Sequence, residues 1–369
     1  MNRLLAPTQV WIDGALQDGL AVELSGRAIA AIRPLKPGET PDLRPHVLMP
    51  ACTDLQVNGS GGVMLNSQPT VDGIAAIVAA QRGLGTGWVM PTLITDAAER
   101  MEAVADAMLA AWGLEGLLGI HIEGPHINPI RKGTHEAAHI RPMDERTFAV
   151  LERLRAAGIP VLLTLAPEIV GAAWIERIAD LGVVVSAGHS MATADEARVG
   201  LEAGARCFTH LYNAMPQMTS REPGIAAAAI NSDAYVGIIV DGHHVSWDMV
   251  ALAWRARPTA RRLFMVSDAM ATVGGPDHFE LYGRRIEVRG GKLVNAEGSL
   301  AGAHVDQLTG LANAVTHVGL PLAEAIAMVT DVPHEALRLT PPRLEVGTTL
   351  EEMVALDEEL RPVALEADV

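Results

Sequence analysis

Short hydrophobic runs alternate with amphipathic helical patterns along most of the chain. From residue 51 onward, several runs rich in Val, Ile, Leu and Phe have the length of a buried strand. They are CTDLQV, GWVMPT, LLGIHI, IPVLLTL, GVVVSA, ARCFT, YVGIIV and RLFMVS. Helical patterns lie between them at 71–83, 97–112, 144–157, 171–180, 193–203 and 246–256, and AAAAIN after Pro223 is a further candidate. This alternation is typical of βα units in a parallel sheet.

The number of strand-like runs favours a closed barrel. Eight parallel strands with helices between them predict an α/β fold of the (β/α)8 TIM-like barrel type. The alternative is a doubly wound open sheet, in which a glycine-rich phosphate loop follows the first strand. The run VNGSGGVM after the first strand is a poor match to the GxGxxG pattern of such a loop.

The two chain ends have a different pattern. Residues 1–50 show short strands separated by turns, and the tail at 341–369 again resembles strands. We therefore expect a small β-sandwich domain built from both chain ends, and a (β/α)8 barrel domain over 51–340 between them in the sequence. The strand pattern at 279–296, with RGGK as a hairpin turn, is a candidate for the same small domain. Helical patterns at 303–318 and 321–330 complete the barrel part.

Composition and charge exclude several classes of partner. Hydrophobic residues make up 49% of the 369 residues, so a large core is expected, and the formal net charge is −16. Nucleic acids and anionic membrane surfaces require a basic footprint, so we expect neither as a partner. The two cysteines, Cys52 and Cys207, lie far apart and predict no disulfide framework. The first residues lack a signal-peptide pattern and no apolar run has the length of a bilayer span, so we expect a cytoplasmic protein.

Metal-binding side chains follow three of the predicted strands. Glu123 ends the third strand, His189 follows the fifth and His210 follows the sixth. A single His is most often a core residue bonded to a backbone carbonyl, but three ligands at the same end of a barrel are much harder to obtain by accident. One carboxylate with two imidazoles is a common ligand set for a catalytic divalent metal, either zinc or iron.

Asp268 and His135 are candidates for the chemistry beside this metal. Asp268, in MVSDAM, follows the eighth strand, where it is placed to take a proton from a water and pass it to a leaving group. The alternative is that it caps a following helix. His135 lies in the long loop after Glu123 and is a candidate to face the substrate, whereas we interpret His126 and His139 as residues of a surface loop.

A turn-rich loop, THLYNAMPQMTSREPG, supplies a candidate for anion binding. Arg221 in this loop has a planar set of donors that suits a phosphate or a carboxylate. The alternative is a structural arginine paired with Glu222 or another acid. Asn213 is a candidate to hydrogen-bond a sugar hydroxyl or the phosphate.

Taken together, these motifs resemble one family. DLQVNGSGG, HIEGPHINPIRKGTHEAAHIRP, VSAGHSMATADEA, FTHLYNAMPQMTSREPG, VDGHHV, SDAMATVG and GSLAGAHV are similar, in this order, to the N-acetylglucosamine-6-phosphate deacetylases of the amidohydrolase superfamily. The resemblance implies hydrolysis of the acetamide of an amino-sugar phosphate to glucosamine 6-phosphate and acetate.

The resemblance also implies roles for individual residues. Glu123, His189 and His210 would bind one divalent metal, zinc with iron as the alternative, and Asp268 would act as general base and then general acid. His135 would contact the substrate near the scissile carbonyl. Residues implied to bind the sugar phosphate are Asn213, Ala214, Arg221 and His244. Arg221 and His244 are expected to reach the site from the partner subunit of a homodimer, and His243 receives no role.

Some positions depart from the patterns of related enzymes. Many amidohydrolases carry a His-x-His pair at the end of the first strand that binds a second metal, but Gln56 and Asn58 stand there. Neutral amides are poor ligands, which predicts a single metal. PACTD replaces the usual PGFID, and Ser220 replaces a glycine in the phosphate loop, where we expect it to stiffen the backbone.

Competing functions remain to be compared. A dihydroorotase-like hydrolase of cyclic amides or dipeptides would usually carry His-x-His and a carboxylated lysine at a strand end, and no lysine follows a predicted strand here. A metal-binding protein without catalysis would not need Asp268. A deacetylase for another epimer, such as N-acetylgalactosamine 6-phosphate, stays open because few contacts read one hydroxyl.

Overall fold

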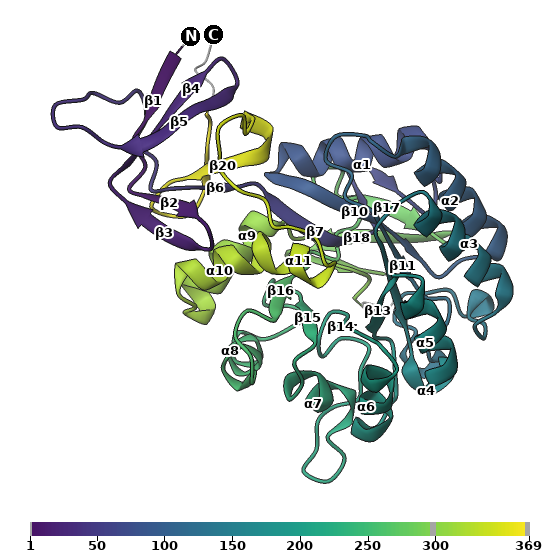
Figure 1. The fold of residues 1–369 in the computed structure, drawn as a ribbon. Helices are drawn as coiled ribbons and strands as arrows, with labels where there is room; N and C mark the ends of the chain where they lie inside the picture. The colour runs from purple at the N-terminus through teal and green to yellow at the C-terminus, as the bar shows by residue number, and fades with distance from the viewer. Residues whose placement is uncertain (1, 296–299, 366–369) are drawn as a thin grey trace.

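The computed structural model of the chain describes residues 2–295 and 300–365 (Figure 1). Residue 296 of the segment 279–296, Gly298 and Ser299 of the GSLAGAHV motif, and the last four residues of the tail 341–369 lie outside the described residues. The small domain lies at one end of the molecule and contains both the first and the last described residues, and the helices of the larger part surround its strands (Figure 1).

Eight parallel strands form the centre of the larger part. Each of the eight predicted runs contributes one of them, and the hydrogen-bonded order is β16-β15-β14-β13-β12-β11-β10-β7. The strands are β7 (Cys52–Val57), β10 (Thr86–Ile94), β11 (Ile120–Glu123), β12 (Val161–Leu165), β13 (Val184–Ala187), β14 (Cys207–Phe208), β15 (Tyr235–Ile238) and β16 (Leu263–Met265). A parallel bridge between Val57 and Ala269 joins the two ends of this order. The sheet is therefore a nearly closed barrel, which confirms the predicted fold class and excludes the open sheet.

Helices follow the strands as the hydrophobic pattern predicts. They are α1 (Val71–Gly83), α2 (Ala98–Ala111), α3 (Glu145–Ala156), α4 (Pro167–Val170), α5 (Ala172–Asp180), α6 (Ala194–Glu202), α7 (Gly224–Ile230), α8 (Trp247–Ala256), α9 (Gln307–Asn313), α10 (Leu322–Val329) and α11 (Asp331–Ala336). Local capping explains several starts: the Thr193 hydroxyl accepts from the Glu196 backbone N–H, and the Glu196 carboxylate accepts from Thr193 in return.

The helix expected at 303–318 begins later than predicted. Ala303 forms a parallel bridge with Ala269, so its backbone belongs to the end of the barrel and is not available for a helix. Asp306 then caps α9 by accepting a hydrogen bond from the Thr309 N–H at 2.8 Å. A π-helical turn at Ala314–Val318 ends this stretch before Gly319, whose φ is 78°.

The small domain consists of two sheets around a shared apolar core. One sheet has the order β1-β4-β5 and the other β21-β20-β6-β2-β3. Their strands are β1 (Asn2–Leu5), β2 (Gln9–Ile12), β3 (Ala15–Asp18), β4 (Leu20–Ser25), β5 (Ala28–Pro34), β6 (Val47–Pro50), β20 (Met353–Leu356) and β21 (Pro362–Val363). Val10, Leu24 and Met353 are among the side chains buried between the sheets. The expected sandwich from both chain ends is therefore present.

The segment expected at 279–296 forms a sheet of its own. Its strands β17 (His278–Leu281), β18 (Arg284–Arg289) and β19 (Lys292–Val294) pair with one another and with neither sheet of the small domain. Their apolar side chains pack on Met64, Ile94 and Met270, at the end of the barrel where the parallel strands finish. The RGGK turn is the expected hairpin, because Gly290 and Gly291 both have positive φ.

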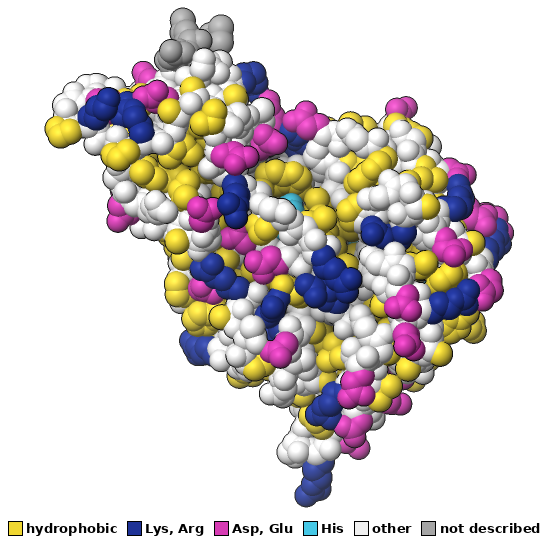
Figure 2. Space-filling view, viewed as in Figure 1, with side chains coloured by type: hydrophobic (Ala, Val, Ile, Leu, Met, Phe, Trp, Pro, Cys, Tyr) yellow, Lys and Arg dark blue, Asp and Glu magenta, His cyan; other side chains and the backbone are white. Residues whose placement is uncertain are grey.

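The surface carries charges of both signs. On the face drawn in Figure 2, Lys and Arg side chains are interspersed with Asp and Glu side chains, so this face offers no continuous basic footprint for a polyanion. Within the described residues, no helix combines the length and the hydrophobicity needed to span a bilayer.

Candidate active site

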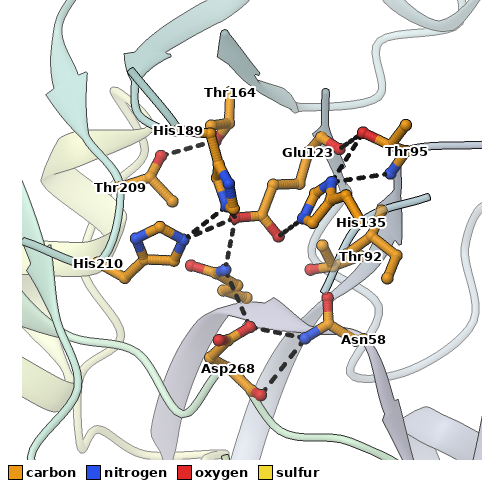
Figure 3. A network of polar contacts seen from close by, with 12 residues as sticks. Asn58, Thr92, Thr95, Glu123, His135, Thr164, His189, Thr209, His210 and Asp268 are labelled. Atoms are coloured by element: carbon orange, nitrogen blue, oxygen red, sulfur yellow. Dashed lines mark hydrogen bonds and ion pairs between the residues drawn. The ribbon is translucent and has the colours of Figure 1, made fainter. Parts of the chain in front are cut away.

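Glu123, His189 and His210 meet at the ends of three barrel strands (Figure 3). Oε1 of Glu123 lies 3.1 Å from Nε2 of His189 and 2.9 Å from Nε2 of His210. The two Nε2 atoms are 3.0 Å apart. All three side chains are buried, and their ligand atoms lie within 4.8 Å of one another. The expected trio is therefore assembled from β11 and from the residues that follow β13 and β14.

The protonation of His189 shows that this cluster fits a cation. Nδ1 of His189 lies 2.8 Å from the backbone carbonyl of Arg131, and a carbonyl can only accept, so Nδ1 carries the hydrogen. In the neutral ring, Nε2 then presents a lone pair to the Glu123 carboxylate. Two acceptors that face each other repel unless a positive charge lies between them. A divalent metal held by these three residues meets that requirement.

The electrostatics of the trio favour the ionised carboxylate. Burial by itself raises the pKa of Glu123, but when no metal is bound, hydrogen bonds and charge from His189 and His210 in their protonated form outweigh burial and hold this pKa well below its usual range. Burial lowers the pKa of His210, and its hydrogen bond with Glu123 together with the negative charge raises it, with a net increase. Glu123 is therefore an anion, which is the form that binds a metal.

The backbone at the site lies in the left-handed region at several functional residues. The φ values are 48° at His189, 28° at His210 and 52° at Asp268. Non-glycine residues rarely adopt such values, and each costs of order 1–3 kcal/mol. The surrounding barrel therefore holds these three side chains in orientations that a free chain would avoid.

Two side-chain amides occupy the position where a second metal would require ligands. Nε2 of Gln56 donates to Oε1 of Glu123 and to Oδ1 of Asp268, both at 3.0 Å. Nδ2 of Asn58 donates to the same Oδ1 at 2.7 Å. These amides hold the two carboxylates with hydrogen bonds, and they are not placed as metal ligands.

Asp268 points into the same site and does not cap a helix. The described residues that follow it form a bridge at Ala269 and turns at 271–274, so the interpretation as a helix cap is wrong. Burial and the negative charge of Glu123 raise the pKa of Asp268. A carboxyl with a raised pKa exchanges a proton more readily near neutral pH, as a general base or acid must.

His135 lies against the trio from the loop after β11. Its ring centroid is 4.4 Å from that of His189, and its Nε2 is 3.8 Å from Oε2 of Glu123. Its Nδ1 lies 2.7 Å from the hydroxyl of Thr95. Burial lowers its pKa well below the usual value, so His135 is a neutral imidazole.

A pocket of about 190 Å³ opens above these residues. Its lining includes Glu123, His189 and His210, then His135 and Asp268, together with Asn213, Ala214 and His244. His244 is oriented by Asp241, whose Oδ2 lies 2.6 Å from its Nδ1. The sequence-predicted residues thus meet in one cavity, except Arg221. The expectation that His244 reaches the site from a partner subunit is wrong, because His244 lines the pocket of its own chain.

Arg221 lies elsewhere on the same chain. It is exposed, in the segment between β14 and α7 that projects from the barrel at the bottom of Figure 1, and it lines a separate surface hollow with Arg198. Within the part of the chain that the structure describes, Arg221 forms no ion pair, so the pairing with Glu222 is not present. This arginine is free to meet another molecule.

Relatives of known function cover nearly the whole chain. N-acetylgalactosamine-6-phosphate deacetylase from Shewanella sp. (strain ANA-3) is 36% identical over 371 residues, covering 97% of this chain and 92% of that protein. N-acetylglucosamine-6-phosphate deacetylase from Haemophilus influenzae is 34% identical over 328 residues, covering 86% and 85%. The chain belongs to the N-acetylglucosamine-6-phosphate deacetylase family. No protein-family model matches the chain.

Solved structures of the same family have the same fold. The deacetylase from Pasteurella multocida superimposes with a TM-score of 0.88 at 31% identity, covering 98% of this chain and 97% of that one. A mutant of the Mycobacterium smegmatis deacetylase in complex with N-acetyl-D-glucosamine-6-phosphate has a TM-score of 0.88 at 28% identity, covering 98% and 96%. The expected enzyme class, an amide hydrolase of the amidohydrolase type, is confirmed.

The structure of this deacetylase-family chain also shows what the sequence interpretation missed. His126 is fully buried, with Nδ1 3.0 Å from the carbonyl of Arg141, so its interpretation as a surface residue is wrong. His139 is partly exposed, as expected for a surface loop. Thr95 was overlooked although it follows directly on the strand that ends at Ile94, and that position at a strand end was the available signal.

Proposed function

We propose that this chain hydrolyses the acetamide of N-acetylglucosamine 6-phosphate to glucosamine 6-phosphate and acetate, in the breakdown and recycling of amino sugars. The observation that carries the proposal is the buried trio of Glu123, His189 and His210 with Asp268 in the same pocket. Asp268 is a further carboxylate beside the three candidate ligands, and hydrolysis has a use for it in proton transfer, whereas metal storage has none. Gln56 and Asn58, in place of His-x-His, argue against a dihydroorotase-like enzyme.

Glu123, His189 and His210 would hold one divalent metal, and we propose zinc because one carboxylate and two imidazoles suit it, with iron as the alternative. When bound, such a cation supplies Lewis acidity, which makes a water nucleophilic near neutral pH and polarises a carbonyl group. The remaining steps belong to the residues of the chain.

Asp268 would move the proton. Its Oδ1 accepts from Gln56 and Asn58, so Oδ2 is the oxygen left to receive a proton from the attacking water. As the water oxygen bonds to the carbonyl carbon and the C–N bond breaks, Asp268 returns that proton to the leaving nitrogen. The products are the amine and acetic acid, which ionises to acetate and releases the second proton of the water. The neutral His135 would stand beside the carbonyl oxygen and donate to it as negative charge develops there.

Asn213, Ala214 and His244 would bind the sugar phosphate within the pocket, and Arg221 would add its guanidinium. Because Arg221 lies outside its own chain's pocket, we propose a homodimer in which it reaches the site of the partner subunit. A cytoplasmic location is part of the proposal, since a phosphorylated sugar carries charge that opposes passage through a membrane.

A second candidate substrate is N-acetylgalactosamine 6-phosphate, because the Shewanella relative at 36% identity is named for that epimer. The deciding experiment is acetate release by the zinc-loaded protein from both epimers, each with and without the 6-phosphate. We expect the phosphorylated glucosamine derivative to have the highest kcat/KM. A higher value for the galactosamine derivative would reverse the assignment, and no release from any of the four would refute the proposed function.

A further inference from the structure

Thr95 lies between the catalytic loop and the sheet formed by β17, β18 and β19. It follows β10 directly and is 1% exposed. Its hydroxyl lies 2.7 Å from Nδ1 of His135, and its backbone N–H points to the same nitrogen at 3.4 Å. Its carbonyl accepts a hydrogen bond from the hydroxyl of Tyr282, in the turn between β17 and β18, at 2.5 Å. Figure 3 shows Thr95 and His135 side by side, with His135 directed toward Glu123.

These contacts determine which nitrogen of His135 carries the hydrogen. A backbone N–H can only donate, so the Nδ1 atom that it faces must accept. The Thr95 hydroxyl has two acceptors within reach, Nδ1 of His135 at 2.7 Å and the backbone carbonyl of Glu123 at 3.5 Å. Donation to Nδ1 is the shorter contact and agrees with the backbone N–H, which can only donate to that nitrogen. In the neutral ring the hydrogen is then on Nε2, which lies 3.8 Å from Oε2 of Glu123, a residue that lines the same pocket.

We infer that Thr95 is a positioning residue, which fixes His135 in the tautomer that presents Nε2–H to the carbonyl oxygen of the substrate. The opposite tautomer would present a lone pair to that oxygen, which would repel the developing negative charge. The inference rests on the proposed function, because it assumes that an amide carbonyl is the group beside His135.

The Thr95 hydroxyl occupies space that is open only because residue 124 is a glycine. A Cβ atom added to Gly124 would lie 2.3 Å from Oγ1 of Thr95, a distance at which one of the two must move. Gly124 also has a φ of 80°, so a side chain there would be strained as well. A side chain at position 124 would therefore displace the Thr95 hydroxyl that contacts His135. Tyr282 holds Thr95 from the other side.

The test compares variants that differ at the hydroxyl. Thr95→Val keeps the shape and the backbone N–H but loses the hydroxyl, and kcat should fall about 10-fold or more with KM changed less than about twofold, as for other residues that orient a catalytic imidazole. Thr95→Ser restores the hydroxyl and should recover most of the lost kcat. Thr95→Ala replaces Thr95→Val if the latter does not fold. The matched control is Thr86→Val in the same strand, because the Thr86 hydroxyl is buried without a hydrogen-bond partner and its loss should leave kcat unchanged.

A double variant separates positioning from general support of the fold. If Thr95 acts through His135, Thr95→Val should lower kcat no further in a His135→Ala background. Equal losses of kcat in both backgrounds would overturn the inference, and so would a Thr95→Val protein with wild-type kcat. Failure of the proposed function is distinguishable, because wild-type protein would then release no acetate from any substrate of the panel.

Discussion

Nδ2 of Asn58 donates a hydrogen bond to Oδ1 of Asp268 over 2.7 Å, and this bond determines which carboxylate oxygen remains available. The side chain of Gln56 donates to the same oxygen at 3.0 Å. Oδ1 is thereby held by two amides, while Oδ2 is left for proton transfer. The amides at these two positions therefore orient the carboxylate that we propose to move the proton.

Replacing the Asp268 carboxylate by an amide tests whether this side chain moves the proton. Asp268→Asn should keep the bound metal and lose about 10²–10⁴-fold in kcat, because an amide does not accept and return the proton. The measurement is steady-state acetate release together with elemental analysis. Asp277→Asn, at an exposed carboxylate farther along the same segment, is the matched control and should retain wild-type turnover. Near-normal kcat in Asp268→Asn would show that another group moves the proton.

Removal of the metal should abolish activity and lower the thermal stability. A chelated protein is expected to regain both with one equivalent of zinc per chain, since a ligand that binds only the folded state stabilises it. His210→Ala should lose metal and activity, whereas His278→Ala, a partly exposed histidine, should keep both. Two tightly bound equivalents would contradict the interpretation of Gln56 and Asn58.

Arg221 should distinguish phosphorylated from unphosphorylated substrates. Arg221→Ala should lower kcat/KM for the 6-phosphate by about 10- to 100-fold, equivalent to about 1.5–3 kcal/mol for a hydrogen bond to a charged group. The sugar without phosphate should be unaffected. Arg198→Ala, on the same surface hollow, is the matched control. An equal loss for both sugars would mean that Arg221 supports the fold.

A complementation experiment tests the subunit from which Arg221 acts. Arg221→Ala and Asp268→Asn chains are mixed after reversible dissociation, so that some dimers contain one of each. If Arg221 serves the partner's pocket, one site in such a dimer carries both intact residues, and activity on the phosphorylated sugar returns. A mixture no more active than its separate components would place Arg221 at its own chain's site or at none.

His334 predicts a loss of stability in mild acid. This histidine is 5% exposed, and burial lowers its pKa from 6.5 to about 4. The unfolded chain therefore binds more protons between these values, so the free energy of unfolding falls as the pH drops through this window. The loss from pH 7 to pH 5 is about 2 kcal/mol. Urea unfolding at pH 7 and pH 5 measures this loss in free energy of unfolding, which should be smaller by about 2 kcal/mol in His334→Gln than in the wild type. The same loss in both proteins would assign the acid sensitivity to other groups.

Much of the barrel could be predicted because its strands are buried on both sides. The run IPVLLTL, for example, contains β12 at Val161–Leu165, and all five of these strand residues are buried. Strands of this kind are short, nearly continuous apolar runs with turn residues on either side, so the sequence pattern alone is enough to identify them. The 278–294 sheet was harder to place, because its pattern shows strands but does not say which part of the molecule covers their apolar side chains.

The clustering of Glu123, His189 and His210 follows from one geometric rule, that parallel strands end on the same side of a barrel. The supporting residues do not follow from such a rule. That Gln56 bonds to both Glu123 and Asp268, or that Thr95 faces His135, depends on side-chain directions across several strands. The position of Arg221 outside its own pocket likewise depends on the path of a long loop, which the sequence pattern leaves open.

The bridge between Val57 and Ala269 closes the barrel beside Asp268, and it has a consequence for local opening. Gly59 N–H donates to the Ala269 carbonyl at 3.1 Å, and the Ser267 N–H is held by the Asp54 side chain at 3.3 Å. Interior strands such as β11 and β12 are instead joined along a continuous ladder from Ile120 to Glu123. Amide hydrogens at this seam should therefore exchange with deuterium faster than those of β12, so that breathing of the barrel begins where Asp268 is attached.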